Sequence, residues 1–104
     1  MQNKKRKKLE AAGWRVGSTR EFLELSDAEA QFLGIKFSLA RMLRQCRERN
    51  HLSQAQLAKK IGSSQSRVAK MEAGDPSVSV DLLMRSLLAV GANSRQLGRT
   101  VSAA

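Results

Sequence analysis

The chain has 104 residues, which is enough for one small domain and an extension. Its 19 Lys and Arg residues outnumber nine Asp and Glu, and the resulting formal charge of +10 favours a polyanionic partner. The single cysteine excludes an internal disulfide, and no apolar run approaches the roughly 18 residues of a transmembrane helix.

Residues 1–8 are a basic tail, because five of the eight are Lys or Arg. Nothing in this tail could form a core, so we expect it to be flexible. It could lie on DNA phosphates or reach into a minor groove, or it could act only as a solubilising tail. The tail also lacks the apolar stretch of a signal peptide, which predicts a cytoplasmic protein without a membrane partner.

Residues 9–37 form an N-terminal extension that is acidic, in contrast to the basic chain that follows. A short helix is expected over Arg20–Leu25, and the capping-box pattern from Ser26 to Glu29 predicts that another helix begins after Ser26. The pattern leaves open whether that helix continues into the next one. The extension could be a protein-binding or dimerising surface, or its aromatic residues could simply enlarge the core. It holds all four aromatics of the chain: Trp14, Phe22, Phe32 and Phe37.

Residues 38–92 are predicted to form the main domain, with a first helix over residues 38–50. The only cysteine, Cys46, lies on the apolar face of this helix and is interpreted as a small buried hydrophobe. The only histidine, His51, is interpreted as a surface or phosphate-proximal residue. Neither has neighbours at metal-ligand spacing, so no metal and no cofactor are expected. The helical spacing of one buried face is given by Leu39, Met42, Leu43 and Cys46.

The stretch Leu52–Gly74 predicts two short helices joined by a tight turn. Ser53 can cap the first helix, and Gln56 completes a capping box with it. Gly62 follows the first helix at once and tolerates the positive φ that turns the chain. Ser64 is the next N-cap, and the Gly-Asp-Pro sequence that begins at Gly74 ends the second helix.

The second helix presents polar side chains outward, and they suit the edge of a DNA major groove. A glutamine can pair there with adenine, and an arginine with guanine. These outward residues are Gln65, Ser66, Arg67 and Lys70. The surrounding chain is strongly basic, as phosphate binding requires, with Glu48 as the only acid between residues 41 and 70. The basic residues of that range are Arg41, Arg44, Arg47, Arg49, Lys59, Lys60, Arg67 and Lys70.

At this point the sequence resembles the helix-turn-helix signature of the Cro and phage-repressor class, the XRE family. The resemblance covers roughly residues 38–92. It implies an all-α fold, a compact four- to five-helix bundle of the lambda-repressor-like DNA-binding type, here with an N-terminal helical extension. The residues that carry it are Leu52-Ser53-Gln54, Leu57-Ala58, Ile61-Gly62, Ser64, Val68 and Met71-Glu72-x-Gly74.

The resemblance also implies roles for individual residues. Gln54 would touch a phosphate and brace Gln65, and Ser64 would cap the recognition helix. Glu72 would be structural rather than a reader of DNA. The alternative is that these polar residues form only a solvated helix face. The predicted DNA-binding set is Gln54, Ser64, Gln65, Ser66, Arg67 and Lys70, together with Lys59 and Lys60.

After the motif, Ser79 can cap a helix that carries Asp81 in its first turn and ends at Gly91. Residues 93–104 are polar and small, so a flexible C-terminal tail is expected. No nucleophile stands near a base in a catalytic arrangement, and no phosphate-cradling glycine loop is present. We therefore expect no catalytic residues and no enzymatic activity.

The function expected from the resemblance is a sequence-specific, double-stranded DNA-binding transcriptional regulator, acting as a repressor. A single small module buries little surface, so a homodimer on a palindromic operator is expected. Its half-sites would lie about 34–36 Å apart, or a multiple of that distance. Such a protein would associate with the bacterial nucleoid when bound to DNA.

An alternative combines this activity with a protein partner. A small reader with an extra segment is similar to HigA-type antitoxins, which bind a small RNA-cleaving toxin and repress their own operon. The acidic, aromatic extension could hold a basic toxin. A third possibility is a nonspecific architectural or RNA-binding protein, which would bind scrambled duplex almost as well as its preferred site.

Overall fold

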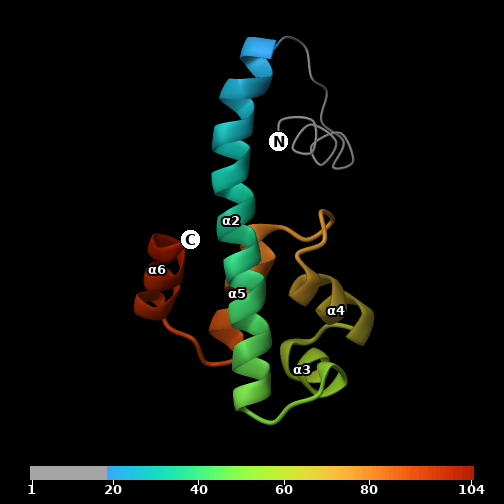
Figure 1. Ribbon diagram of the computed structural model, residues 1–104. Helices are drawn as coiled ribbons and strands as arrows, with labels where there is room; N and C mark the ends of the chain where they lie inside the picture. The colour runs from blue at the N-terminus through green and yellow to red at the C-terminus, as the bar shows by residue number, and fades with distance from the viewer. Residues whose placement is uncertain (1–18) are drawn as a thin grey trace. The chain divides into compact units, whose positions relative to one another are not determined.

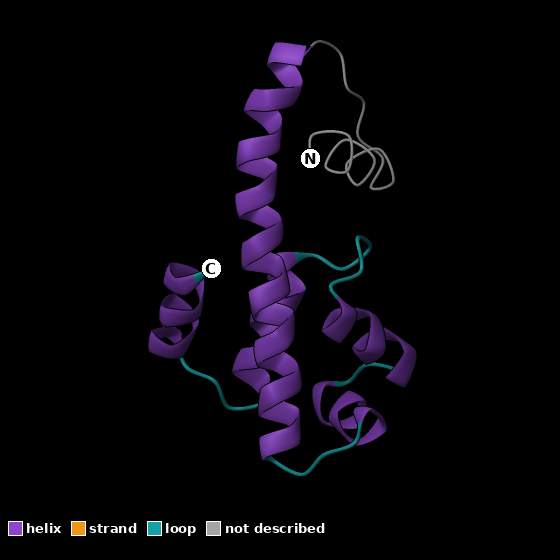
Figure 2. Ribbon diagram, in the orientation of Figure 1, coloured by secondary structure: helices purple, strands orange, loops and turns teal. Residues whose placement is uncertain are grey.

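A computed structural model describes the backbone of residues 19–104 and the side chains of residues 26–104. The described chain is all-α, as predicted, and contains helices and loops only (Figures 1 and 2). The basic tail at residues 1–8, Trp14 and Phe22 lie outside the residues whose side chains are described. The helices are α2 (Thr19–Arg49), α3 (Gln54–Ile61), α4 (Gln65–Ala73), α5 (Val80–Ala89) and α6 (Ser94–Ala103).

The chain divides into two compact units, residues 1–33 and residues 34–104. The second unit holds residues 34–49 of α2 and all of α3 to α6. Within this unit, α3 and α4 pack against each other on one side of α2, and α6 lies on the other side (Figure 1). The second unit therefore contains the whole predicted helix-turn-helix.

Helix α2 corrects the prediction for the N-terminal extension. The sequence predicted a short helix over 20–25 and a second helix beginning after Ser26, whereas one helix runs through Ser26 without interruption. The Ser-x-x-Glu pattern is therefore not a cap here, because no helix-breaking residue precedes it. The chain's one proline is Pro76, and the lone Gly34 costs only about 1 kcal/mol relative to alanine, which is too little to end a helix. The helix also continues into the segment predicted as residues 38–50.

The core of the second unit is built from the apolar faces that the spacing predicted. Leu39 and Leu43 of α2 are fully buried, while Met42 and Cys46 on the same helix are half-buried and pack against the core. Helices α3, α4 and α5 each add one or two fully buried side chains, which hold α3 and α4 in place. These are Leu57 on α3, Val68 and Met71 on α4, and Leu83 and Leu87 on α5.

Helix α6 occupies Ser94–Ala103 of the segment 93–104, so the prediction of a flexible C-terminal tail was wrong. The Asn93 side chain accepts a hydrogen bond from the Gln96 backbone N–H at 2.9 Å, and the Gln96 side chain accepts one from the Asn93 N–H at 2.9 Å. Leu97 is buried. The Thr100 hydroxyl donates to the Met42 sulfur at 3.3 Å, which joins α6 to α2.

Candidate nucleic-acid interface

The first helix of the motif, α3, is capped at both ends by local interactions. The Ser53 hydroxyl accepts from the Gln56 N–H at 3.1 Å, and the Gln56 side chain accepts from the Ser53 N–H at 2.8 Å. Gly62 ends α3 with a left-handed φ of 71°, as predicted. A residue with a Cβ is disfavoured in this conformation, so the glycine sets the tight turn into α4.

The second helix, α4, starts at the serine that the sequence indicated. The Ser64 hydroxyl accepts a hydrogen bond from the Arg67 backbone N–H at 3.2 Å and lies 3.3 Å from the Ser66 hydroxyl. Because the cap uses only the backbone of Arg67, the guanidinium remains available for a ligand. Gly74 ends the helix with a φ of 67°.

A groove of about 350 Å³ runs beside α4, and its lining is polar. Four predicted DNA-binding residues meet there: Ser64, Ser66, Arg67 and Lys70. Ser77 and Val78, in the loop that follows α4, complete the lining. The groove therefore brings hydroxyl, guanidinium and ammonium groups together on one exposed surface.

Sequence reasoning missed Ser77, although the Asp75-Pro76-Ser77 pattern did predict a loop. The Asp75 carboxylate accepts from the Ser77 hydroxyl at 2.6 Å and from the Ser77 N–H at 2.9 Å. These two hydrogen bonds, the hydroxyl first, lower the pKa of Asp75 below its usual 3.8. The turn they close holds Ser77 beside the groove. An Asp followed two residues later by Ser is the local signal that could have identified it.

The other predicted DNA-binding residues lie outside the groove. Gln65 is exposed at the start of α4, and Lys59 and Lys60 are exposed in the last turn of α3. Gln54 is only partly exposed, and its side-chain amide donates to the Glu72 carboxylate at 3.2 Å. The described contact of Gln54 is thus with Glu72, where the resemblance implied Gln65.

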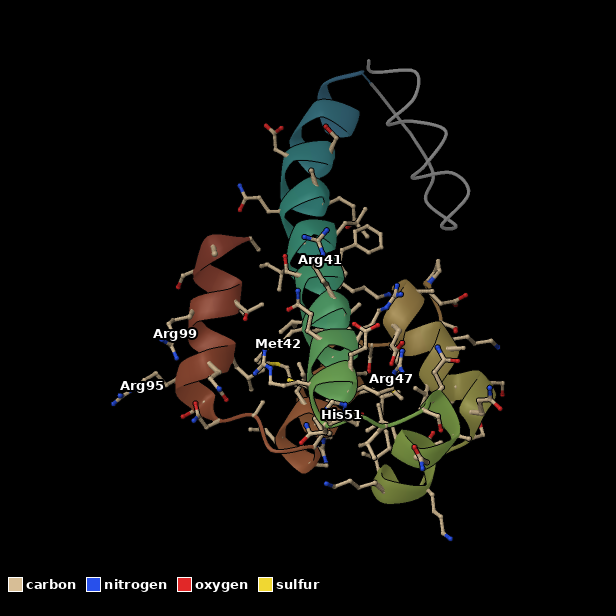
Figure 3. The ribbon with its side chains drawn as sticks, turned by 60° about the horizontal axis from the view of Figure 1, so that its bottom comes forward. Arg41, Met42, Arg47, His51, Arg95 and Arg99 are labelled. Atoms are coloured by element: carbon tan, nitrogen blue, oxygen red, sulfur yellow. The ribbon has the colours of Figure 1, made fainter. Side chains whose placement is uncertain are left out.

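Glu72 is the centre of a buried polar cluster behind the exposed face. Its carboxylate accepts two hydrogen bonds from Arg47, at 2.6 and 3.0 Å, and the side chains of Arg47 and Glu72 are only 14% and 6% exposed. Arg47 also donates to the Leu52 carbonyl at 2.9 Å. The carboxylate raises the pKa of Arg47, so the guanidinium stays charged. Figure 3 shows Arg47 on the side of α2 that faces α3 and α4.

The structural role expected for Glu72 is consistent with this cluster. Arg47, however, is one of the basic residues that the sequence pattern predicts for phosphate binding. Its side chain is instead mostly buried, and it joins α2 to Glu72 of α4 and to the Leu52 carbonyl that precedes α3. The cluster fixes the position of α4, and with it the residues of the groove.

The exposed surface of α3 and α4 is positive because its Lys and Arg side chains form no ion pairs with the acidic residues that the structure describes. Among the described side chains, those of Arg67, Lys70, Lys59 and Lys60 form no ion pair and no hydrogen bond. Residues 34–104 contain four acids, and each has a bond elsewhere: Glu48 to Arg44, Glu72 to Arg47, Asp75 to Ser77, and Asp81 to Arg85. A polyanion would therefore meet four cations on α3 and α4 that form no ion pair or side-chain hydrogen bond within the described part of the chain.

Two capped helices, a glycine turn, and a positive, polar outer surface on the second helix form a helix-turn-helix. Comparison with protein families agrees: residues 43–85 match the Helix-turn-helix family, which is the XRE type. This family binds DNA and is typically non-enzymatic. The match covers α3, α4, the end of α2 and the first half of α5. Comparison with curated proteins and with solved structures found no match.

Two further findings concern the described residues alone. No helix among them is both long enough and apolar enough to cross a membrane. No group of three or more His, Cys, Asp or Glu side chains in this part of the chain could hold a metal ion. His51 is exposed and ends the turn after α2 with a φ of 57°.

Proposed function

We propose that this protein is a sequence-specific regulator of transcription that represses its target by occupying double-stranded DNA. The observation that carries the proposal is the exposed groove along α4, where the Arg67 and Lys70 side chains form no ion pair with any described residue and lie beside Ser64 and Ser66. The N-terminal turns of α4 enter the major groove. There Arg67 and Gln65 contact base edges, because guanidinium and amide groups match guanine and adenine.

In this proposal the remaining cations position the domain on the backbone. Lys59 and Lys60 in α3, and Lys70 in α4, contact phosphates, which carry no sequence information. Ser64, Ser66 and Ser77 can donate hydroxyl hydrogen bonds to phosphate oxygens at the same surface. Gln54, whose side-chain amide is hydrogen-bonded to Glu72, lies at the start of α3 and adds a further contact to the DNA backbone.

We propose that the protein acts as a homodimer on a palindromic operator. A single module of this kind buries only about 600–1,000 Å² on DNA, which is small for useful specificity. Two copies would place their α4 helices in successive major grooves on one face of the duplex, about 34–36 Å apart. Selection of binding sites from a random duplex library at near-physiological salt tests this directly. A palindromic consensus is expected, and an enriched pool without a consensus would refute specific recognition.

Two substitutions separate base contacts from phosphate contacts. Arg67→Ala should weaken binding to the selected site by about 1–3 kcal/mol and relax specificity at one position. Lys59→Ala should weaken binding to all sequences alike and flatten the slope of log K against log salt by about one unit. Both side chains are exposed and unpaired, so neither change should alter folding. If both variants lose affinity equally on every sequence, Arg67 does not read a base.

A second candidate function is that of an antitoxin, which would also bind a small basic RNA-cleaving toxin through the N-terminal extension. The observation that favours it is Phe32, which is 46% exposed on a helix that also presents Asp27 at its surface. An exposed aromatic on a helix that also carries exposed acid suits a basic protein partner. Co-expression with the product of the adjacent reading frame tests it. Stable co-purification and loss of RNA cleavage are expected, and both should fail in a Phe32→Ser variant.

A further inference from the structure

A second groove lies between residues 34–49 of α2 and helix α6, and the proposed function does not use it. Its volume is about 210 Å³. Figures 1 and 3 show that α6, with Arg99, lies on the side of α2 away from α3, α4 and Arg47. The groove is lined by the apolar Met42 and Cys46 and by the polar Gln45, Arg49, Gln96, Arg99 and Thr100.

The lining of this groove is cationic and contains no acid. Arg49 and Arg99 come from positions 50 residues apart in the sequence, yet both line the groove, and among the described side chains neither forms an ion pair or hydrogen bond. The four acids of residues 34–104 are all bonded elsewhere, so no carboxylate compensates these two charges. Two like charges at one groove repel, and a bound anion would remove that repulsion.

The other side chains add hydrogen-bond donors. The Gln96 side-chain oxygen accepts from the Asn93 N–H, so its amide NH₂ group remains free to donate. Gln45 supplies a second amide. Guanidinium groups bind phosphate oxygens in a planar, bidentate way that suits a dianion better than a single carboxylate. The volume is below the roughly 300–1,000 Å³ of drug-sized pockets, so it fits a phosphate or pyrophosphate group rather than a whole large ligand.

We infer that the α2–α6 groove is a second phosphate-binding site, separate from the DNA-reading surface of α4. Arg49 and Arg99 hold the phosphate, and Gln45 and Gln96 donate hydrogen bonds to its oxygens. Helix α6 lies outside the matched residues 43–85, so the site is an addition to the helix-turn-helix itself. The phosphate belongs either to a free phosphorylated small molecule or to the backbone of a DNA segment that α4 does not contact.

The test is a titration of the full-length, ¹⁵N-labelled protein followed by amide NMR at constant ionic strength. Sodium pyrophosphate is added in one series and a short duplex of random sequence in the other. Saturable shifts of the amides of residues 45–49 and 96–100 are expected. Shifts with pyrophosphate identify a free phosphorylated ligand, and shifts with duplex alone identify the DNA backbone. If neither probe shifts these amides, the inference is wrong, whatever happens on α4.

The matched variants are Arg99→Gln and Arg85→Gln, which remove the same charge from exposed positions on two neighbouring helices. Arg85 pairs with Asp81 on α5 and does not line the groove. Arg99→Gln should weaken binding of the effective probe about tenfold, the loss expected for one charge-assisted contact. Arg85→Gln should leave it unchanged. Equal weakening in both variants would mean that net charge alone attracts the phosphate, and the site would be refuted.

Discussion

The buried pair of Arg47 and Glu72 gives a quantitative prediction for stability. Glu72→Gln keeps the size of the side chain but removes the charge that compensates Arg47, which is only 14% exposed. Removing one partner of a buried ion pair costs about 3–5 kcal/mol, because the other charge is left unpaired. Since Arg47 retains its bond to the Leu52 carbonyl and some access to water, we expect about 3 kcal/mol.

Glu48→Gln is the matched control for this prediction. Glu48 also pairs with an arginine, Arg44, at 3.3 Å, but these side chains are 54% and 63% exposed. Each glutamate stands one position before the last residue of its helix, so any interaction with the helix dipole is similar in both variants. The exposed pair should contribute only a few tenths of a kcal/mol.

Urea unfolding followed by circular dichroism at 222 nm measures both variants. A loss of about 3 kcal/mol is a large part of the 5–15 kcal/mol that stabilises a typical small protein, so Glu72→Gln should shift the midpoint strongly. Glu48→Gln should barely move it. If the two variants lose equal free energy of unfolding, the Arg47–Glu72 pair does not hold α4, and the reasoning from burial is refuted.

Two other predictions concern the residues that follow α3 and α4. Gly62→Ala should lower the free energy of unfolding in urea by about 1 kcal/mol, because its φ is 71°. Gly74→Ala should lower it by about 2 kcal/mol or more, because the added Cβ would also overlap the ring of Phe37. Equal losses in the two variants would contradict this reasoning. The lowered pKa of Asp75 stabilises the fold above its unfolded value of 3.8, and the contribution disappears as pH falls through the lower folded value. Unfolding measured from about pH 6 to about pH 2 should therefore show a stability advantage over Asp75→Asn that is lost at the acid end, and an advantage independent of pH would count against the bonds from Ser77.

Capping patterns in the sequence predicted the start of a helix correctly only where a turn preceded them. Ser53 and Ser64 each follow a turn and precede apolar residues at helical spacing, and both are caps. Ser26 has the same pattern but follows residues that continue a helix, so it lies inside α2. Asn93 was missed because α6 has few apolar residues to mark it, although Leu97 anchors it in the core.

Contacts between distant residues could not be predicted from local spacing. Arg47 and Glu72 are 25 positions apart, and the sequence does not distinguish a buried arginine from the exposed ones around it. Charge counting therefore assigned Arg47 to the exposed basic surface. The contribution of Ser77 to the groove likewise depends on how the loop after α4 folds back. What the sequence did predict was the helix-turn-helix and its outward face, because capping and apolar periodicity are local properties.

The tie between Arg47 and Glu72 has a consequence for how related sequences can diverge. Neither residue can change alone without leaving a buried charge, so in a family of such proteins the two positions should vary together. The exposed Arg67, Lys70 and Gln65 are free of this constraint. They can change one at a time, and each change can alter the DNA sequence recognised while the helix that carries them stays in place.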